Sequence, residues 1–284
     1  ERSIRFETRE GVCGRDGEFW SDCANGRNRH ELSSSSDAEP SDTDLWYSLS
    51  VFIPEEFDSP LNIGTTIFQF WSGGLDSWSF KYDTGVGLYL RHQLRNDVKV
   101  LVADSSTKGR WIDLIWRIRH SLRDSGSMTV WVDGDVAYDY VGRTNHGDDP
   151  NAPNYFKFGI YNTALGMDGA PVDGASNGNG EGLPNLHLYF DEVRYARSCA
   201  GLGPEDLGYD CADFSYENAD PELVRQLQMA LNELGCEVGT ADGIIGRRTL
   251  AAAKACRYFG PGELPQVVTA GNLDSFVERY QTAA

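Results

Sequence analysis

Short runs of alternating apolar and polar residues fill the first 198 residues of this 284-residue chain. Side chains of a β-strand point alternately to opposite faces, so such runs predict strands with one buried face and one solvated face. Turn residues separate the runs, and Asp133-Gly134 within "WVDGDVAY" is typical of a tight hairpin turn. Many short strands with almost no helical pattern predict a mainly β fold, a sandwich or jelly roll.

The run "YFKFGIYN" at residues 155–162 shows the two faces most clearly. Its even-numbered positions up to 160 are apolar and are expected to contact a core. The other face carries Tyr155, Lys157 and Tyr161, and a glycine between the last two leaves bare backbone where another group could approach closely. This face is either an ordinary solvated surface or a site for an anionic ligand.

The composition divides the chain into three segments. Residues 1–198 are predicted to form the β domain, and residues 199–218 a connector pinned by a disulfide. In residues 219–284 leucines recur at helical spacing, Asp220 can cap a helix and Gly235 can end it, so a small helical domain is expected.

The six cysteines fall into close pairs, which are Cys13 with Cys23, Cys199 with Cys211, and Cys236 with Cys256. The chain has no CxxC motif and no histidine cluster beside them, so zinc is not expected. Three local disulfides in an exported protein, extracellular or periplasmic, fit this spacing. The alternative is reduced cysteines in a cytosolic protein.

The net charge of −18 argues against nucleic acid as a partner, and no apolar run is long enough to span a membrane. An anionic substrate therefore requires basic residues to cluster locally. Candidates are Arg5 in "IRFETR" and Arg91, which shares one face of a predicted strand with the polar Gln93. The alternative for each arginine is a scattered surface charge.

Three motifs in chain order resemble those of jelly-roll polysaccharide lyases. "NRHELS" is similar to the R-x-E-L strand of alginate lyases, "IFQFW" to their Q-I-H strand, and "YFKFGIYN" to their YFKxGxYxQ strand. Three further segments look like strands of the glucuronan-lyase and heparin-lyase I type, namely "GRWIDLIWRIRHS", "VWVDGDVAYDY" and "LYFDEVRYA". The resemblance implies a concanavalin A-like jelly roll that cleaves 4-linked uronate polymers by β-elimination and leaves an unsaturated uronate.

The chemistry of that reaction suggests roles for the matching residues. Removal of the C5 proton and expulsion of the O4 oxygen spread negative charge into a carboxylate that is already negative. Gln69 and Arg29 are suited to stabilise that charge, because an amide and a guanidinium donate hydrogen bonds to it. Tyr161 would move the proton, and Lys157 is expected to favour its ionised form, since a free phenol has a pKa near ~10.

The motifs do not supply a catalytic base at the expected position, because Trp71 stands where the alginate-type motif has histidine. His30 is one substitute, but if Arg29 faces the groove, strand alternation turns His30 towards the core unless a bulge intervenes. Alternatively Tyr161 both takes the proton and returns it to O4. That scheme requires the two groups to leave from the same side of the ring, as in β-1,4-linked glucuronate or mannuronate. The sequence therefore favours glucuronan-like or mannuronate-like polymers.

The remaining predictions concern the loop at 166–185 and the C-terminal segment. The loop is rich in Gly, Asn and Asp and is predicted to be a lid; its oxygen ligands would suit Ca²⁺, although no cofactor is required by the proposed chemistry. Residues 219–284 resemble the peptidoglycan-binding type 1 domain in "LQMALNELG" and "DGIIGRRT". That resemblance implies a three-helix fold that binds cell-wall glycan, or serves only as a spacer.

Two other functions compete with the lyase. A hydrolase on this fold needs two carboxylates at a fixed separation, and the adjacent Asp191-Glu192 lie on opposite faces of their strand. A lectin-like binding module of the concanavalin A-like fold is the stronger rival, because such sandwiches host both lectins and enzymes. The polar face formed by Gln69, Arg29 and Tyr161 favours the enzyme.

Overall fold

A computed structural model gives the fold of most of the chain. The described residues are 2–10, 12, 14–16, 20–22, 24, 26–34, 39–59, 64–72, 75–146, 154–163, 185–214, 220–245, 249, 252, 273–274, 277–278 and 281. The predicted lid lies almost wholly outside these residues, and so do the proposed Cys13–Cys23 pair and most of the second predicted helix.

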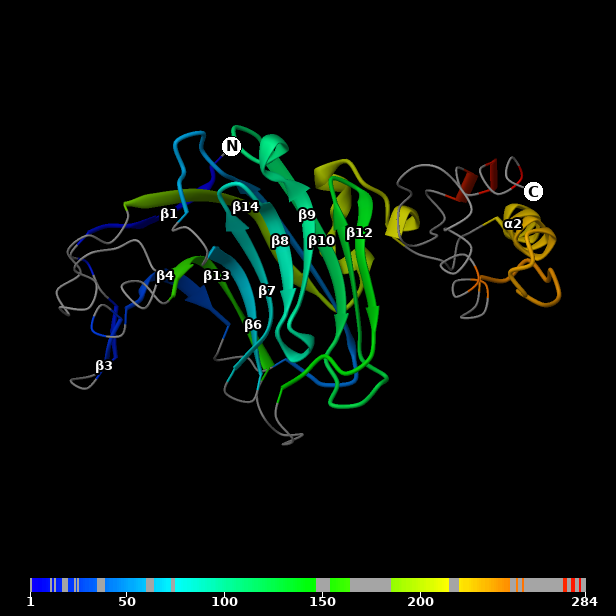
Figure 1. Cartoon of the computed structure of the whole chain (residues 1–284), viewed down its shortest axis with the longest axis horizontal. Coiled ribbons are helices and arrows are strands. Elements are labelled where there is room, and N and C mark those ends of the chain that lie inside the picture. The colour runs from blue at the N-terminus through cyan, green and yellow to red at the C-terminus, as the bar shows by residue number, and fades with distance from the viewer. Residues whose placement is uncertain are drawn as a thin grey trace.

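Two six-stranded antiparallel sheets face each other as a sandwich (Figure 1), so the predicted mainly β fold is confirmed. The first sheet has the order β1 (Ile4–Thr8), β14 (Leu186–Ala196), β5 (Asp44–Phe52), β10 (Trp111–Arg119), β11 (Ser127–Val132), β12 (Asp135–Val141). The second has the order β4 (Asn28–Ser33), β13 (Asn154–Asn162), β6 (Thr65–Ser72), β7 (Leu75–Asp83), β8 (Gly87–His92), β9 (Asp97–Ala103). A small hairpin pairs β2 (Arg15–Asp16) with β3 (Trp20–Ser21), and 3-10 turns follow β8 (Gln93–Arg95) and β9 (Asp104–Ser106).

The strand order brings distant segments together. In the second sheet β13 lies between β4 and β6, although more than half of the β-domain sequence separates it from β4. The three strands that carry the sequence motifs are therefore neighbours.

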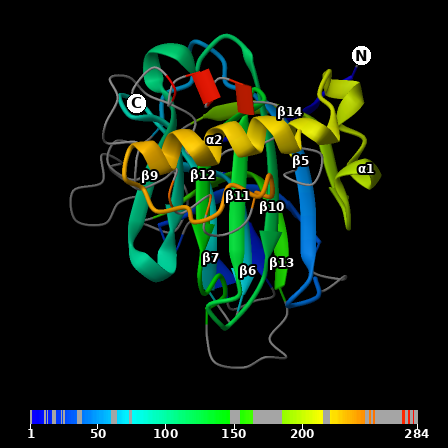
Figure 2. The same ribbon diagram turned by 90° about the vertical axis from the view of Figure 1, so that its right-hand side faces the viewer.

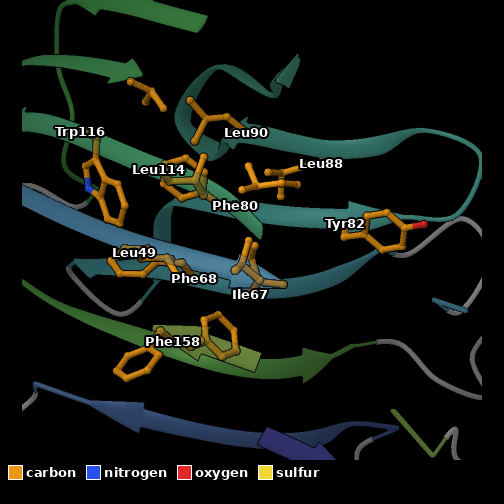
Figure 3. Packing of buried hydrophobic residues seen from close by; sticks show 14 of the residues in the cluster. Leu49, Ile67, Phe68, Phe80, Tyr82, Leu88, Leu90, Leu114, Trp116 and Phe158 are labelled. Atoms are coloured by element: carbon orange, nitrogen blue, oxygen red, sulfur yellow. The ribbon is translucent and has the colours of Figure 1, made fainter. Parts of the chain in front are cut away.

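Aromatic and aliphatic side chains together fill the core between the sheets (Figure 3). Phe68 of β6 meets Trp116 of β10 edge-on with ring centroids 4.7 Å apart, and Tyr47 of β5 stacks on the same Trp116 at 5.4 Å. Phe158 and Ile160 of β13 are buried in the same cluster. Each such side chain contributes roughly 1.5–3 kcal/mol on burial, so the second sheet is firmly held against the first.

The β11–β12 hairpin turns at the predicted dipeptide. Asp133 and Gly134 both have positive φ, +51° and +88°, as a two-residue type I′ turn requires. The prediction from "WVDGDVAY" is confirmed.

The segment after β14 packs on the first sheet. It contains α1 (Cys199–Leu202) and two 3-10 turns, Pro204–Leu207 and Cys211–Phe214, and the predicted Cys199–Cys211 disulfide joins its ends. Leu202 and Phe214 are buried with Trp46 and Trp131 in a second apolar cluster. This segment is therefore part of the β domain's packing and not a free linker.

Helix α2 (Pro221–Glu233) begins where the sequence predicted, with the Asp220 side chain accepting a hydrogen bond from the Glu222 amide. Leu227 and Leu231 on its apolar face are buried in a separate cluster with Val238 and Leu273. The helix lies outside the sandwich (Figures 1 and 2). Cys236 is disulfide-bonded, and its expected partner Cys256 is not among the described residues.

Gly159 allows β13 to pass close to β4. Its φ is +141°, and a Cβ at this position would collide with the His30 carbonyl oxygen and lie 2.9 Å from the Cα of Glu31. Only glycine tolerates both the dihedral angle and the contact. The group that approaches the bare backbone is therefore the neighbouring strand.

The Gly159→Ala variant is expected to lose more than about 3 kcal/mol in free energy of unfolding, because backbone strain and overpacking add. Gly85→Ala is the matched control: φ there is +87° and no atom lies within 4 Å of the added methyl group, so only about 1–2 kcal/mol should be lost. Urea unfolding measures both values. Equal losses would show that the contact with β4 does not require glycine.

Candidate active site

The candidate site lies on the face of the second sheet that is turned away from the core. In β13 the side chains of Phe158 and Ile160 enter the core, so those of Tyr155, Lys157 and Tyr161 emerge on the other face. This agrees with the alternation read from the sequence. We call this surface the site face.

Strand register aligns the motif residues across the site face. Tyr161 of β13 pairs with Arg29 of β4, and Lys157 pairs with Gln69 of β6. The row of Lys157 and Gln69 continues through Ser79 of β7 to Arg91 of β8. In a neighbouring row Tyr155 pairs with Trp71 of β6. The structure therefore brings seven of the sequence-predicted residues onto one surface.

Arg29 is fixed by a buried carboxylate. Its Nε and one terminal nitrogen donate to the two oxygens of Asp22 at 2.7 and 2.6 Å, a bidentate pair. The side chain of Asp22 is 3% exposed. The hydrogen bond to Asp22 raises the pKa of Arg29 above its ordinary value, so the guanidinium stays charged.

Arg29 is also the cation beside Tyr161. Its guanidinium carbon lies 4.7 Å from the centre of the Tyr161 ring. Burial raises the pKa of the Tyr161 phenol, and the charges of Arg27 and Arg29 oppose that rise. The site therefore protects the phenol from solvent while keeping positive charge next to it.

Lys157 does not occupy the place that the sequence suggested for it. Its ammonium lies over the rings of Trp71, at 4.8 Å, and Tyr155, at 5.6 Å. Burial lowers the pKa of Lys157, and Glu31 opposes that change. The prediction that Lys157 favours the ionised form of Tyr161 is wrong, and Arg29 is the cation beside that ring. Lys157 and Tyr161 point to the same face of β13, but they are four residues apart, which separates them by about 13 Å along the strand.

Glu31 lies at the centre of the site face, and the sequence interpretation gave it no role. Gln69 Nε2 donates to Glu31 Oε1 at 2.7 Å. Burial raises the pKa of this carboxyl, while Gln69, Lys157 and Arg29 act in the opposite direction. The R-x-E-L pattern was the available signal, because alternation puts Glu31 on the same face as Arg29. Asp22 had no comparable signal in the sequence.

Two predicted site residues lie elsewhere. His30 is turned away from the site face, with Nδ1 3.0 Å from the Glu7 carbonyl oxygen and its ring against Phe6. The bulge that could have turned it towards the substrate is absent from the described β4–β13 register. Arg5 belongs to β1 of the first sheet and binds Glu7 at 2.8 Å, so it cannot line the site face.

Gln93 lies just beyond β8, in a 3-10 turn, so the prediction that it shares a strand face with Arg91 is wrong: the strand ends at His92. Lys81 of β7 is buried, and burial together with the charge of Arg91 lowers its pKa to about 8. His92 is stacked on Trp78 at 3.7 Å, and His120 forms a buried pair with Glu39, so both are engaged away from Tyr161.

Within the described residues, no three His, Cys, Asp or Glu side chains gather in a way that could hold a metal ion. The oxygen ligands suggested for Ca²⁺ (Asp173, Asn177, Asn179 and Glu181) lie outside those residues. None of the described helices has the length and apolar content that crossing a membrane requires.

Comparisons with known proteins point to one family. A family model described as polysaccharide lyase matches residues 1–194. Among solved structures, an endo-β-1,4-glucuronan lyase from the fungus Trichoderma reesei aligns with a TM-score of 0.52 and 17% identity, over 72% of this chain and 84% of that one. An alginate lyase from Corynebacterium sp. aligns with a TM-score of 0.43 and 14% identity, over 68% and 76% of the two chains. No curated protein sequence matches significantly.

Replacing Asp22 by asparagine is expected to destabilise the protein by about 3 kcal/mol or more, because it leaves the half-buried Arg29 without its counter-charge. Asp44→Asn is the matched control, since its pair with Arg119 has a similar distance of 2.7 Å but side chains 39% and 37% exposed. Its cost should be about 1 kcal/mol or less. Chemical denaturation compares the two, and equal effects would contradict the assignment of Asp22 as the residue that holds Arg29.

Proposed function

The chain belongs to the polysaccharide lyase family, and from this premise we propose that it cleaves a 4-linked uronate polymer by β-elimination on the site face. Tyr161 is the proton carrier, and Gln69 and Arg29 stabilise the charge that develops on the substrate carboxylate. The observation that carries the proposal is the packing of Arg29 against Tyr161 at 4.7 Å, one strand away from the buried amide of Gln69.

The electrostatic arrangement suits this reaction. The rising charge on a carboxylate is stabilised best by donors that are already oriented and shielded from water. Gln69 is only 3% exposed, and Arg29 is held on two sides, by Asp22 and by the Tyr161 ring. Each donor keeps N–H groups that the bonds to Asp22 and Glu31 do not use.

Tyr161 acts as both base and acid in this scheme. Its phenolate takes the C5 proton and the phenol then returns that proton to the O4 oxygen as the glycosidic bond breaks. The three histidines placed above are engaged elsewhere: His30 faces Glu7, His92 stacks on Trp78, and His120 pairs with Glu39. A single proton carrier requires both groups on one side of the ring, so glucuronan-like or mannuronate-like chains are the proposed substrates.

Neighbouring sugar units would lie along the rows of the sheet. Trp71 and Tyr155 offer ring faces 6.4 Å apart, with the Lys157 ammonium above them. Aromatic faces bind sugar rings, and the cation suits a second uronate carboxylate. Arg91 lies two strands from Gln69 and is placed to bind a third uronate carboxylate. This local group of cations allows a protein of net charge −18 to bind an anionic polymer.

Family membership favours the enzyme over a lectin-like binding module, which has no use for a shielded amide and a guanidinium around a phenol.

The Cys199–Cys211 disulfide supports an oxidising compartment, extracellular or periplasmic. Attachment to cell-wall glycan through residues 219–284 remains our proposal from sequence resemblance. Its test is retention on peptidoglycan with and without these residues.

The Tyr161→Phe variant is expected to lose at least about 100-fold in kcat, because general acid–base catalysis contributes that much or more. The assay follows the ultraviolet absorbance of the unsaturated uronate on glucuronan and polymannuronate. Tyr155→Phe is the matched control on the same strand, and it should change KM more than kcat. A Tyr161→Phe enzyme with more than about a tenth of wild-type kcat would contradict the assignment.

His30→Ala tests the single-carrier scheme separately. The variant is expected to keep kcat within about threefold of the wild type, because its imidazole is turned towards Glu7 and contributes no acid–base catalysis. A loss comparable with that of Tyr161→Phe, in a protein of unchanged melting temperature, would restore histidine as the base.

A further inference from the structure

Glu31 is the one carboxylate at the centre of the site face in the part of the chain that the structure describes, and the scheme above leaves it unused. Its Oε1 accepts a hydrogen bond from Gln69 at 2.7 Å. Its Oε2 is fully buried and has no hydrogen-bond partner among the described residues. A buried carboxylate oxygen without a partner is costly, so this atom calls for an explanation beyond packing.

The surroundings of Glu31 are electrically balanced before substrate binds. The charges that act directly on Glu31 are those of Arg29, Lys157 and Asp22, and all four groups interact. In their ionised forms the four carry two positive and two negative charges, so they balance. Tyr161 and Tyr155 are the neighbouring phenols, and both have pKa values raised by burial. Arg27 faces Tyr161 and is not among the charges that act on Glu31.

The proposed substrate carboxylate must enter this cluster, because its donors Gln69 and Arg29 are the groups around Glu31. It would bring an uncompensated negative charge next to a buried carboxylate. Two carboxylates that share a desolvated site do not both stay ionised, since repulsion raises one pKa strongly. Uptake of one proton restores neutrality.

We propose that Glu31 takes one proton from solvent when a uronate binds, and that the resulting carboxylic acid donates a hydrogen bond to the substrate carboxylate. Two observations support this role: Glu31 already contacts Gln69, the other donor, and its second oxygen has no hydrogen-bond partner among the described residues. Because that oxygen is buried in the free protein, the side chains that cover it must move aside when the uronate enters. This inference rests on the proposed function and adds a catalytic residue to it.

The protonated Glu31 would stay hydrogen-bonded to the substrate carboxylate throughout the reaction. As Tyr161 removes the C5 proton, the second negative charge develops on the carboxylate oxygens, and the hydrogen bond from Glu31 strengthens with that charge. The C5 proton goes to Tyr161 and then to O4, so the proton on Glu31 is not consumed. It returns to solvent when the unsaturated product leaves. The raised pKa of Glu31 in the free protein, caused by burial, lowers the free energy needed to protonate it.

The test is the pH dependence of binding in the Tyr161→Phe protein, which should bind without turnover. The probe is a trisaccharide of β-1,4-glucuronate or β-1,4-mannuronate, whichever polymer the wild type cleaves. Uptake of one proton predicts that Kd rises about tenfold per pH unit above the pKa of free Glu31. In the double variant Tyr161→Phe/Glu31→Gln the glutamine amide mimics the protonated Glu31, so Kd should change far less with pH. Lys81, with a pKa of about 8, affects both proteins equally.

Calorimetry gives a second readout that needs no change at Glu31. Titrations of Tyr161→Phe at pH 7 in two buffers of different ionisation enthalpy should show close to one proton taken up per trisaccharide bound. Binding without uptake, or the same pH slope in both proteins, would overturn the inference while leaving the lyase proposal intact. Failure of the wild type to form unsaturated product from either uronate polymer, or of either trisaccharide to bind, would overturn both proposals.

Discussion

The close approach of β13 to β4 at Gly159 is the constraint on which the candidate site depends. Because this residue has no side chain, the two backbones pair with Tyr161 opposite Arg29 and Gly159 opposite Glu31. On its other edge β13 pairs with β6 and sets Lys157 opposite Gln69. A shift of the strand register by one residue in either pairing would turn these side chains into the core.

The proposed function requires a strongly acidic protein to bind an acidic polymer. Local charge, not net charge, decides the interaction, because charges on the far surface are screened over a Debye length of roughly 8–10 Å. On the site face Arg29 and Lys157 each have a fixed neighbour: Asp22 for Arg29 and aromatic rings for Lys157. These contacts hold the donors in place before substrate arrives, which reduces the cost of ordering them on binding.

Strand alternation was sufficient to predict much of the site. It placed Tyr155, Lys157 and Tyr161 together, and it correctly warned that His30 and Arg29 would face opposite ways. Alternation describes one strand at a time, however, and the neighbours of a strand depend on topology. For that reason Arg5 was wrongly expected to join the basic residues of the site, although it lies on β1 of the first sheet.

The partners of the site residues were harder to predict than the residues themselves. Asp22 lies outside any regular pattern, and its bond to Arg29 depends on how the chain before β4 folds back. The cation beside Tyr161 is Arg29 and not Lys157, because a cross-strand neighbour lies closer than a residue four positions along the strand. Motif spacing carries no information on such contacts.

The central claim is that the substrate carboxylate binds between Gln69, Arg29 and Glu31, with C5 facing Tyr161. A crystal structure of the Tyr161→Phe protein with a bound uronate trisaccharide tests it most directly. We predict carboxylate oxygens within hydrogen-bond distance of all three side chains and C5 next to the ring edge at position 161. A carboxylate bound instead by Lys81 and Arg91, with C5 remote from position 161, would contradict the account.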